Sequence, residues 1–386
     1  MRRRKSGVAG VSRKMDKTRY LFEGREEMIT PVLLYYKDYI TENIKKAIRM
    51  AGDSERLWPH VKTHKTRELI SLLIDHGITR FKCATIAEAE ITASCGPSDL
   101  LLAYPLVGPN ISRFLALQRE FPGVRFWAIG DDPEHVRQLG TAALAAGMRV
   151  RFLTDVNVGQ NRTGVPFERL ISFYEEVSAI EGLEPDGFHC YDGHIHQSSY
   201  AVRSHLASEI TERTLSAKKE LTDRGYSCSV LVMGGTPAFP CYAAYPDVYL
   251  SPGTIFLSDY GYASSYREMD FIPAGIIMTR VISRPASDTF TLDLGYKGIA
   301  ADPDGVRGVI LGMEETAVSL FQSEEHWVFR IAAGHEDEIP PIGSELFVVP
   351  THICPSTALY PFVPVVEQGR VTECWEIAAR NRRVTL

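Results

Sequence analysis

A regular alternation of short apolar runs with longer amphipathic stretches begins near residue 57 and constrains the fold more than any other feature. The runs are rich in β-forming residues and cover 57–62, 80–84, 99–103, 125–129, 149–155, 186–191, 227–233 and 248–251. Between them lie helical patterns at 66–76, 86–95, 111–121, 133–146, 167–180 and 199–224, several of which stop at glycine. Eight such repeats predict an α/β fold, a (β/α)8 TIM barrel, with a doubly wound parallel sheet as the alternative.

The pattern changes near Phe271, where strands and turns punctuated by Pro and Gly replace the helices. This change predicts a second, all-β C-terminal domain. The earlier run 30–36 precedes the barrel and could pair with that domain. We therefore expect four regions. They are a disordered arm (1–18), an N-terminal segment partly pairing with the β domain (19–56), a barrel (57–268) and a β domain (269–386).

Composition narrows the classes of function. The 386 residues are 45% apolar and 23% charged, which is ordinary for a soluble globular protein. The net charge of −6 gives no reason to expect a nucleic-acid partner, and no apolar run is long enough for a membrane span. The basic N-terminus lacks the apolar core of a secretory signal. Seven scattered cysteines without a C-x-x-C pair indicate a reducing compartment, so we expect a cytoplasmic protein.

The segment L-W-P-H-V-K-T-H-K-T, residues 57–66, places Lys62 and Lys65 at the end of the first expected barrel strand. Burying an ammonium group without a partner is costly. A desolvated lysine, however, loses its proton readily and can form a Schiff base with an aldehyde cofactor. These ten residues alone fit a basic surface turn equally well.

Glycine-rich turns follow the seventh and eighth runs, as M-G-G-T-P and S-P-G-T. Barrels commonly bind a phosphate through backbone N–H groups at these two turns. Together with a strand-end lysine they suit a phosphorylated aldehyde, pyridoxal 5′-phosphate (PLP). The candidate phosphate-binding residues are Gly235, Thr236, Gly253 and Thr254.

Two further strand ends carry candidate residues. Tyr191 ends the sixth run, directly before D-G-H-I-H-Q. The segment D-V-N-V-G-Q-N-R-T-G-V ends the fifth run, and it would direct Arg162 toward the barrel mouth unless that arginine lies in a surface turn.

His352 and Cys354 form a candidate metal site in P-T-H-I-C-P-S-T. Side chains two residues apart on an extended segment face the same way. Imidazole plus thiolate suits Zn²⁺ better than Mn²⁺ or Mg²⁺, and two protein ligands leave positions open for water or substrate, as in a catalytic site. A buried cysteine beside an unrelated histidine is the alternative.

With these segments assembled, the chain resembles the D-threonine aldolase/D-serine dehydratase family of fold-type III PLP enzymes, which is related to alanine racemase. The matching segments run in order: P-H-V-K-T-H-K-T (59–66), F-K-C-A-T-I-A-E-A-E (81–90), D-V-N-V-G-Q-N-R-T-G-V (155–165), H-C-Y-D-G (189–193), S-P-G-T (251–254) and P-T-H-I-C-P-S (350–356).

The resemblance implies a role for each candidate. Lys62 would carry PLP, Tyr191 would lie against the cofactor ring and Arg162 near its phenolic oxygen. The two glycine turns would hold the phosphate, and His352 and Cys354 would bind a divalent metal, with Zn²⁺ favoured and Mn²⁺ or Mg²⁺ as alternatives. The resemblance also implies a homodimer with shared active sites, in which the β domain of one chain meets the barrel mouth of the other.

Three positions depart from the family pattern. Asn157 replaces an expected Asp, and Ser251 stands where alanine racemases have an arginine facing the pyridine nitrogen. Y-D-G-H-I-H-Q replaces the aldolase pattern Y-H-G-x-x-Q-H, which leaves Gln197 at the usual position of the histidine base. His196 or His194 would then serve as the base, or Lys62 would act alone.

We therefore expect a PLP- and metal-dependent lyase for a D-3-hydroxy amino acid. The first expectation is D-threonine aldolase-type cleavage to glycine and an aldehyde. The alternative is D-serine dehydratase-type elimination to a keto acid and ammonia, which the cysteine ligand favours. An amino-acid racemase and a non-catalytic PLP carrier are remote alternatives.

Overall fold

Eight parallel segments close into a barrel in the computed structural model, which describes residues 15–386. Seven of them are strands that pair in chain order. They are β2 (Arg80–Cys83), β3 (Asp99–Leu102), β4 (Arg125–Gly130), β5 (Val150–Asn157), β7 (Leu183–Cys190), β8 (Val230–Met233) and β9 (Tyr249–Leu250), with β6 (Val165–Pro166) beside the end of β5. Residues 57–60 close the ring, because Leu57 bridges to Leu250 and His60 to Lys82. The predicted TIM barrel is confirmed, and the doubly wound alternative is wrong.

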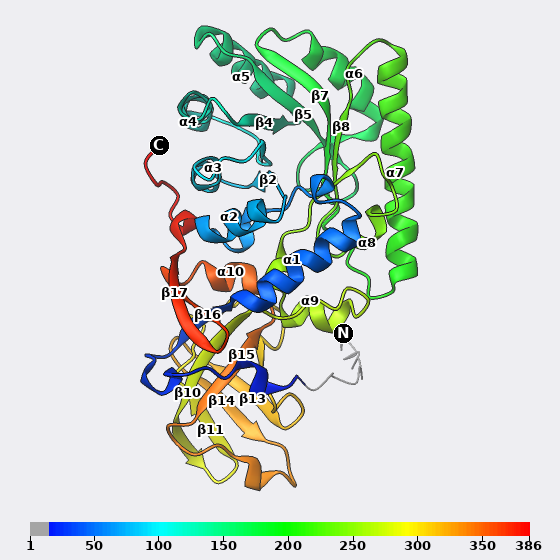
Figure 1. Ribbon diagram of the computed structural model, residues 1–386. Helices are drawn as coiled ribbons and strands as arrows, with labels where there is room; N and C mark the ends of the chain where they lie inside the picture. The colour runs from blue at the N-terminus through cyan, green and yellow to red at the C-terminus, as the bar shows by residue number, and fades with distance from the viewer. Residues whose placement is uncertain (1–14) are drawn as a thin grey trace.

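Helices cover the outside of this barrel (Figure 1). Each predicted helix is present within a few residues of its expected range. They are α2 (Arg67–Asp75), α3 (Ile86–Ala93), α4 (Pro109–Glu120), α5 (Pro133–Ala145), α6 (Phe167–Ser178) and α7 (Tyr200–Asp223), followed by the short α8 (Phe239–Tyr242) and α9 (Tyr260–Ser265). Local sequence explains several starts: the Asp132 side chain accepts the N–H groups of Glu134 and His135, and Pro133 occupies the first turn of α5.

The barrel strands alternate between two environments, which positions the site. Outward side chains such as Phe81 and Phe188 pack against the helices. Inward side chains form a separate apolar core. That inner core consists of Trp58, Leu101, Trp127, Ile129, Leu153, Val230 and Val232. In the same inward register, Lys82 pairs with Leu101, and Asp155 and His189 pair with each other beside Val232. The interior therefore becomes polar near the carboxyl ends of the strands.

The second domain is built on one mixed sheet (Figure 1). Its strands are β10 (Gly275–Ala286), β11 (Thr289–Leu292), β12 (Gly308–Ile310), β13 (Ala317–Gln322), β14 (Trp327–Ile331), β15 (Glu345–Pro350), β16 (Phe362–Glu367) and β17 (Arg370–Glu376). The N-terminal β1 (Val32–Tyr36) lies between β10 and β16, antiparallel to the first and parallel to the second. The strands expected from the sequence did not include β13, none of whose side chains is buried, so it gives no buried alternation.

Helix α1 (Lys37–Ala51) leads from β1 to the barrel. Its buried Asn43 donates to the carbonyls of Phe256 and Ile272 and accepts the Ile272 N–H, so it ties the start of the chain to the segment between the domains. Of the expected N-terminal arm, residues 1–14 lie outside the described residues, and Lys17–Tyr20 forms the 3-10 helix η1. Across residues 15–386, no helix combines the length and apolar character that a membrane crossing requires.

Candidate active site

Lys62 lies at the barrel mouth. Directly after the closing segment, the chain turns through the 3-10 helix η4 (Val61–Thr63), and the His60 ring accepts the Lys62 N–H at 3.3 Å. The Lys62 ammonium lies 5.9 Å from the centre of the Tyr191 ring. Lys65 instead forms an ion pair with the buried Glu88. Of the two lysines in this motif, Lys62 is therefore the one that faces Tyr191.

Three cationic groups surround the Tyr191 ring. Besides Lys62, the Arg162 guanidinium carbon lies 4.8 Å from the ring centre and the Lys82 ammonium 5.6 Å from it. Cations at these distances are attracted to the face of an aromatic ring. Three sequence-predicted residues are involved in this arrangement, and Lys82 joins them as one that the sequence reading missed.

The loop that carries Arg162 is held by side-chain hydrogen bonds. The Asn157 oxygen accepts the N–H groups of Gly159 and Asn161 at 3.0 and 3.1 Å, and its amide donates to the Asn161 side-chain oxygen at 2.9 Å. The Asp131 carboxylate accepts the Gly164 N–H at 2.6 Å. Asn157, one of the three departures from the family pattern, therefore serves to shape this loop.

Lys82 is almost fully buried, with 2% of its surface exposed. Burial, and then the neighbouring Lys62, lowers the pKa of Lys82 to about 7, while Asp192 and Asp155 oppose that shift. The sequence signal for this residue is its place in F-K-C, where outward Phe81 and Cys83 flank a single inward lysine.

His189 and Asp155 form a buried pair below the mouth. The His189 Nδ1 lies 2.7 Å from the Asp155 Oδ1. Among the described residues, neither the His189 Nε2 nor the Asp155 Oδ2 has a hydrogen-bond partner. Burial lowers the pKa of His189 despite the adjacent carboxylate. The sequence reading used both segments but assigned neither residue, whose shared inward register appears only when strands β5 and β7 are paired.

The two glycine turns meet each other. The Thr236 hydroxyl oxygen accepts the N–H groups of Gly253 and Thr254 at 3.1 and 3.2 Å. A Cβ atom at Gly235 would approach the Tyr191 ring to 3.0 Å, a tight contact that glycine avoids. All four predicted phosphate-binding residues thus lie together at the mouth.

These residues fit PLP. The turns supply small residues, N–H groups and hydroxyls, as a phosphate requires. The buried Ser251 hydroxyl has no hydrogen-bond partner among the described residues, so it remains available to a ligand atom. It occupies the position where alanine racemases have an arginine.

Cys354 reaches the barrel mouth of its own chain. The short helix α10 (Ile353–Thr357) lies between the barrel and the β domain (Figure 1). The Cys354 sulfur lies 3.2 Å from the Thr63 hydroxyl and 3.4 Å from that of Thr254. The family resemblance implied that the β domain meets the barrel of a partner chain, but this contact forms within one chain. The reach of Cys354 therefore gives no reason for a shared site.

His352 is oriented by a carboxylate. Its Nδ1 lies 2.6 Å from the Asp302 Oδ2. Burial lowers the pKa of His352, but hydrogen bonding to Cys354 and Asp302 raises it to about 9. Burial raises the pKa of the Cys354 thiol, yet His352, Thr254 and Thr63 together hold it below its usual value.

The pair fits an open divalent site. Within residues 15–386, no group of three His, Cys, Asp or Glu side chains is arranged to hold a metal ion. The imidazole and thiol interact with each other, and two such ligands leave room for water or substrate oxygen. The Asp302 contact matches the carboxylate that commonly orients a metal-binding histidine.

The two candidate histidine bases lie at the edge of the site. His194 is half-buried against Gly159, where a Cβ would come within 2.8 Å of its Nε2. His196 is exposed, and its carbonyl accepts the Tyr266 hydroxyl at 3.1 Å. Among the described residues, neither ring is hydrogen-bonded to Lys62, His352 or Cys354, so their role as a base stays a prediction.

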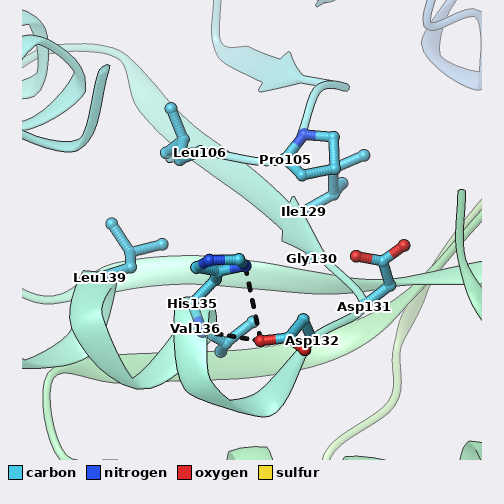
Figure 2. A pocket seen from close by; sticks show the side chains of 9 residues that line it. All are labelled: Pro105, Leu106, Ile129, Gly130, Asp131, Asp132, His135, Val136 and Leu139. Atoms are coloured by element: carbon cyan, nitrogen blue, oxygen red, sulfur yellow. Dashed lines mark hydrogen bonds and ion pairs between the residues drawn. The ribbon is translucent and has the colours of Figure 1, made fainter. Parts of the chain in front are cut away.

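Figure 2 shows a surface hollow at the carboxyl ends of β3 and β4. It is lined by Pro105, Leu106, Ile129, Gly130, Asp131, Asp132, His135, Val136 and Leu139. None of the predicted site residues lines it. The hollow is connected to the site through Asp131, whose side chain anchors the loop that carries Arg162. We therefore assign the hollow itself no role in the chemistry.

Asp192 makes the stability of the cofactor-free protein depend on pH. Burial raises its pKa from 3.8 to about 7. Because the folded state keeps this proton longer than the unfolded state, stability falls as the pH rises from about 4 to 7. Asp192→Asn should remove that loss and stabilise the protein above pH 7 by the order of 2–4 kcal/mol.

Calorimetric melting from pH 4 to 8 tests this expectation. The exposed Asp223→Asn serves as the control and should leave the pH dependence unchanged. A wild-type minus Asp192→Asn difference that is constant over this range would contradict the assignment.

Two family models match the chain. The model described as "Alanine racemase, N-terminal domain" matches residues 37–260. The chain belongs to this family. A second model, "Putative serine dehydratase domain", matches residues 274–366. The boundary between the models falls where the barrel gives way to the β domain.

Individual relatives cover both domains. A D-threonine aldolase from Arthrobacter sp is 28% identical over 84% of this chain and 85% of its own length. A D-serine dehydratase from Saccharomyces cerevisiae is 23% identical over 86% and 90%. The crystal structure of D-threonine aldolase from Filomicrobium marinum superposes with a TM-score of 0.82 at 26% identity, covering 92% of this chain and 96% of that one. These findings confirm the resemblance. Since such relatives are aldolases and dehydratases, the chain is an enzyme of the lyase class.

Proposed function

We propose that the protein is a PLP- and metal-dependent lyase that cleaves a D-3-hydroxy amino acid to glycine and an aldehyde. One observation carries the proposal: Cys354 contacts Thr63, the residue next to Lys62. A candidate metal ligand and the candidate cofactor lysine therefore lie at one barrel mouth. The whole-length similarity to the Arthrobacter D-threonine aldolase supports the same reading.

The chain's own residues would bind and orient the reactants. PLP, when bound, supplies an electron sink for negative charge at the substrate carbon, and a divalent metal, when bound, polarises the 3-hydroxyl. The two glycine turns would hold the phosphate through Gly235, Thr236, Gly253 and Thr254, and Tyr191 would pack against the ring. The Lys62 Nζ would anchor the cofactor and carry a proton to or from the substrate carbon.

The proton of the 3-hydroxyl needs its own acceptor. We assign this role to His194 or His196, with Lys62 as the alternative. His194 is the better placed of the two histidines, because it is half-buried against the loop that carries Arg162.

Dehydratase-type elimination is the second candidate, and the Cys354 thiol favours it. A thiolate prefers Zn²⁺ over Mn²⁺ and Mg²⁺, and contacts with His352 hold the pKa of this thiol below its usual value. A zinc ion would help hydroxide leave the substrate. The similarity to the yeast D-serine dehydratase supports this alternative.

Product analysis distinguishes the candidates. The purified protein, supplied with PLP and Zn²⁺ or Mn²⁺, is incubated with D-threonine and with D-serine. Aldolase-type action should release glycine and an aldehyde in equal amounts without ammonia. Release of ammonia and a keto acid without glycine would replace our proposal with the dehydratase. Racemisation of alanine alone would contradict both.

We further propose that the protein is a cytoplasmic homodimer that acts on a small D-amino acid. All seven cysteines are free, as expected in a reducing compartment. Sedimentation at assay concentration should give a mass of about twice 43.1 kDa. A fully active monomer would contradict the dimer proposal.

A further inference from the structure

The barrel mouth holds more positive charge than its carboxylates neutralise. Lys62, Lys82 and Arg162 all face the Tyr191 ring. Within residues 15–386, no carboxylate forms an ion pair with Lys82. Of the two nearby carboxylates, Asp155 is hydrogen-bonded to His189, and burial raises the pKa of Asp192 to about 7.

Lys82 has no structural task that explains this position. It is 2% exposed, and its backbone N–H, not its side chain, makes the bond to Pro59 that helps close the barrel. Its partner in β3, Leu101, is apolar, and its partner on the other side is His60. A methionine would fill the same space without an ammonium group. Burying an unpaired ammonium costs free energy, so an anionic ligand beside Lys82 would account for its position.

The neighbours of Lys82 compensate its charge only in part, through Asp155 and Asp192 at longer range. The His60 ring is kept neutral, because burial and then Lys62 and Lys82 hold its pKa well below the usual value. Burial likewise lowers the pKa of His189, with Lys82 and Arg162 contributing. An anionic oxygen brought in by a ligand would balance the cations without any rearrangement of these side chains.

We propose that Lys82 is a ligand-binding residue whose ammonium holds an anionic oxygen beside the Tyr191 ring, next to Arg162. This proposal rests on the proposed function, which identifies the two anionic oxygens available at this depth. One is the phenolate oxygen of the cofactor, and the other is the carboxylate of the substrate. Lys62 is reserved for the covalent bond, so Lys82 is the second amine of the site.

The experiment compares the wild type with Lys82→Met, which keeps length and removes charge, and with Lys82→Arg, which keeps charge. Lys219→Met is the control, since that lysine is exposed on α7. In the first arm, without substrate, PLP affinity and the pH midpoint of the bound cofactor's visible absorbance are measured. If Lys82 holds the phenolate, Lys82→Met should weaken PLP binding at least tenfold and raise the midpoint by about one pH unit, because a nearby cation is lost.

The second arm measures substrate binding to the cofactor-loaded proteins. If Lys82 holds the substrate carboxylate, the cofactor spectrum should stay unchanged. The affinity for D-threonine should then fall at least tenfold, while that for 1-amino-2-propanol, which lacks the carboxylate, should not change. In both cases Lys82→Arg should retain much of the wild-type behaviour.

A third readout separates ligand binding from a structural role. Without cofactor, Lys82→Met should melt at or above the wild-type temperature, because it removes a buried charge. A Lys82→Met variant that binds PLP and D-threonine within twofold of the wild type would overturn the proposal, as would loss of folding in both Lys82→Met and Lys82→Arg. A wild type that forms no cofactor band would overturn the proposed function as well, which distinguishes the two failures.

Discussion

Replacing Lys62 with alanine is expected to remove the covalent attachment of the cofactor and to lower turnover by roughly three orders of magnitude or more. The reason is geometric. Lys62 lies on η4 at the mouth and faces Tyr191, and among the described residues its ammonium has no carboxylate ion-pair partner. Borohydride reduction followed by peptide mapping should place the cofactor on Lys62 in the wild type and on no lysine in the variant.

Lys65→Ala provides the matched control within the same motif. Lys65 is ion-paired with the buried Glu88, so this variant should lose stability but retain the reducible adduct. An adduct trapped on Lys65 or Lys82 in the wild-type protein would show that our assignment of Lys62 is wrong.

Exhaustive chelation is expected to lower lyase turnover at least about a hundredfold and to leave the cofactor band in place. The cofactor is held by barrel residues, whereas the metal is assigned to His352 and Cys354, which follow β15 of the β domain. Zn²⁺ should restore activity better than Mn²⁺, and metal affinity should fall at low pH as both ligands take up protons.

Cys354→Asp should move the metal preference toward Mn²⁺ and the products toward glycine and an aldehyde, because a harder ion assists hydroxide departure less. The exposed Cys374→Ala is the control and should retain the wild-type metal content. Turnover that is undiminished after chelation, with no metal found by elemental analysis, would end the metal proposal and favour a racemase.

The barrel could be predicted because its signal is local and repeated. Each strand shows a short apolar run, and several helices end at a glycine, so many weak local indications agree. The first strand is the exception. Only Leu57 and His60 form bridges there, because Pro59 has no N–H to donate. The strand is short, and Lys62 lies on the 3-10 turn η4 that follows it.

Only the part of the site that local sequence signals mark could be predicted. Lys62, Tyr191 and the glycine turns stand at strand ends, which a single segment reveals. Lys82 and the pair of His189 with Asp155 could not be found from a single segment, because their inward direction depends on pairing between strands. The contact of Cys354 with Thr63 joins positions far apart in sequence, and no periodicity encodes it.

The position of β1 has a consequence for synthesis of the chain. Val32–Tyr36 is made early, but its neighbours in the sheet are β10 and β16, so the whole barrel is an insertion within the second domain. At ordinary translation speeds, β1 waits roughly 15–65 seconds for Val365 and Val366 to be made. Until β10 has been made, V-L-L-Y-Y, four-fifths of which is buried in the final fold, has no native partner in the sheet. The nascent chain therefore depends on fast barrel folding or on a chaperone to keep this strand from pairing with another molecule.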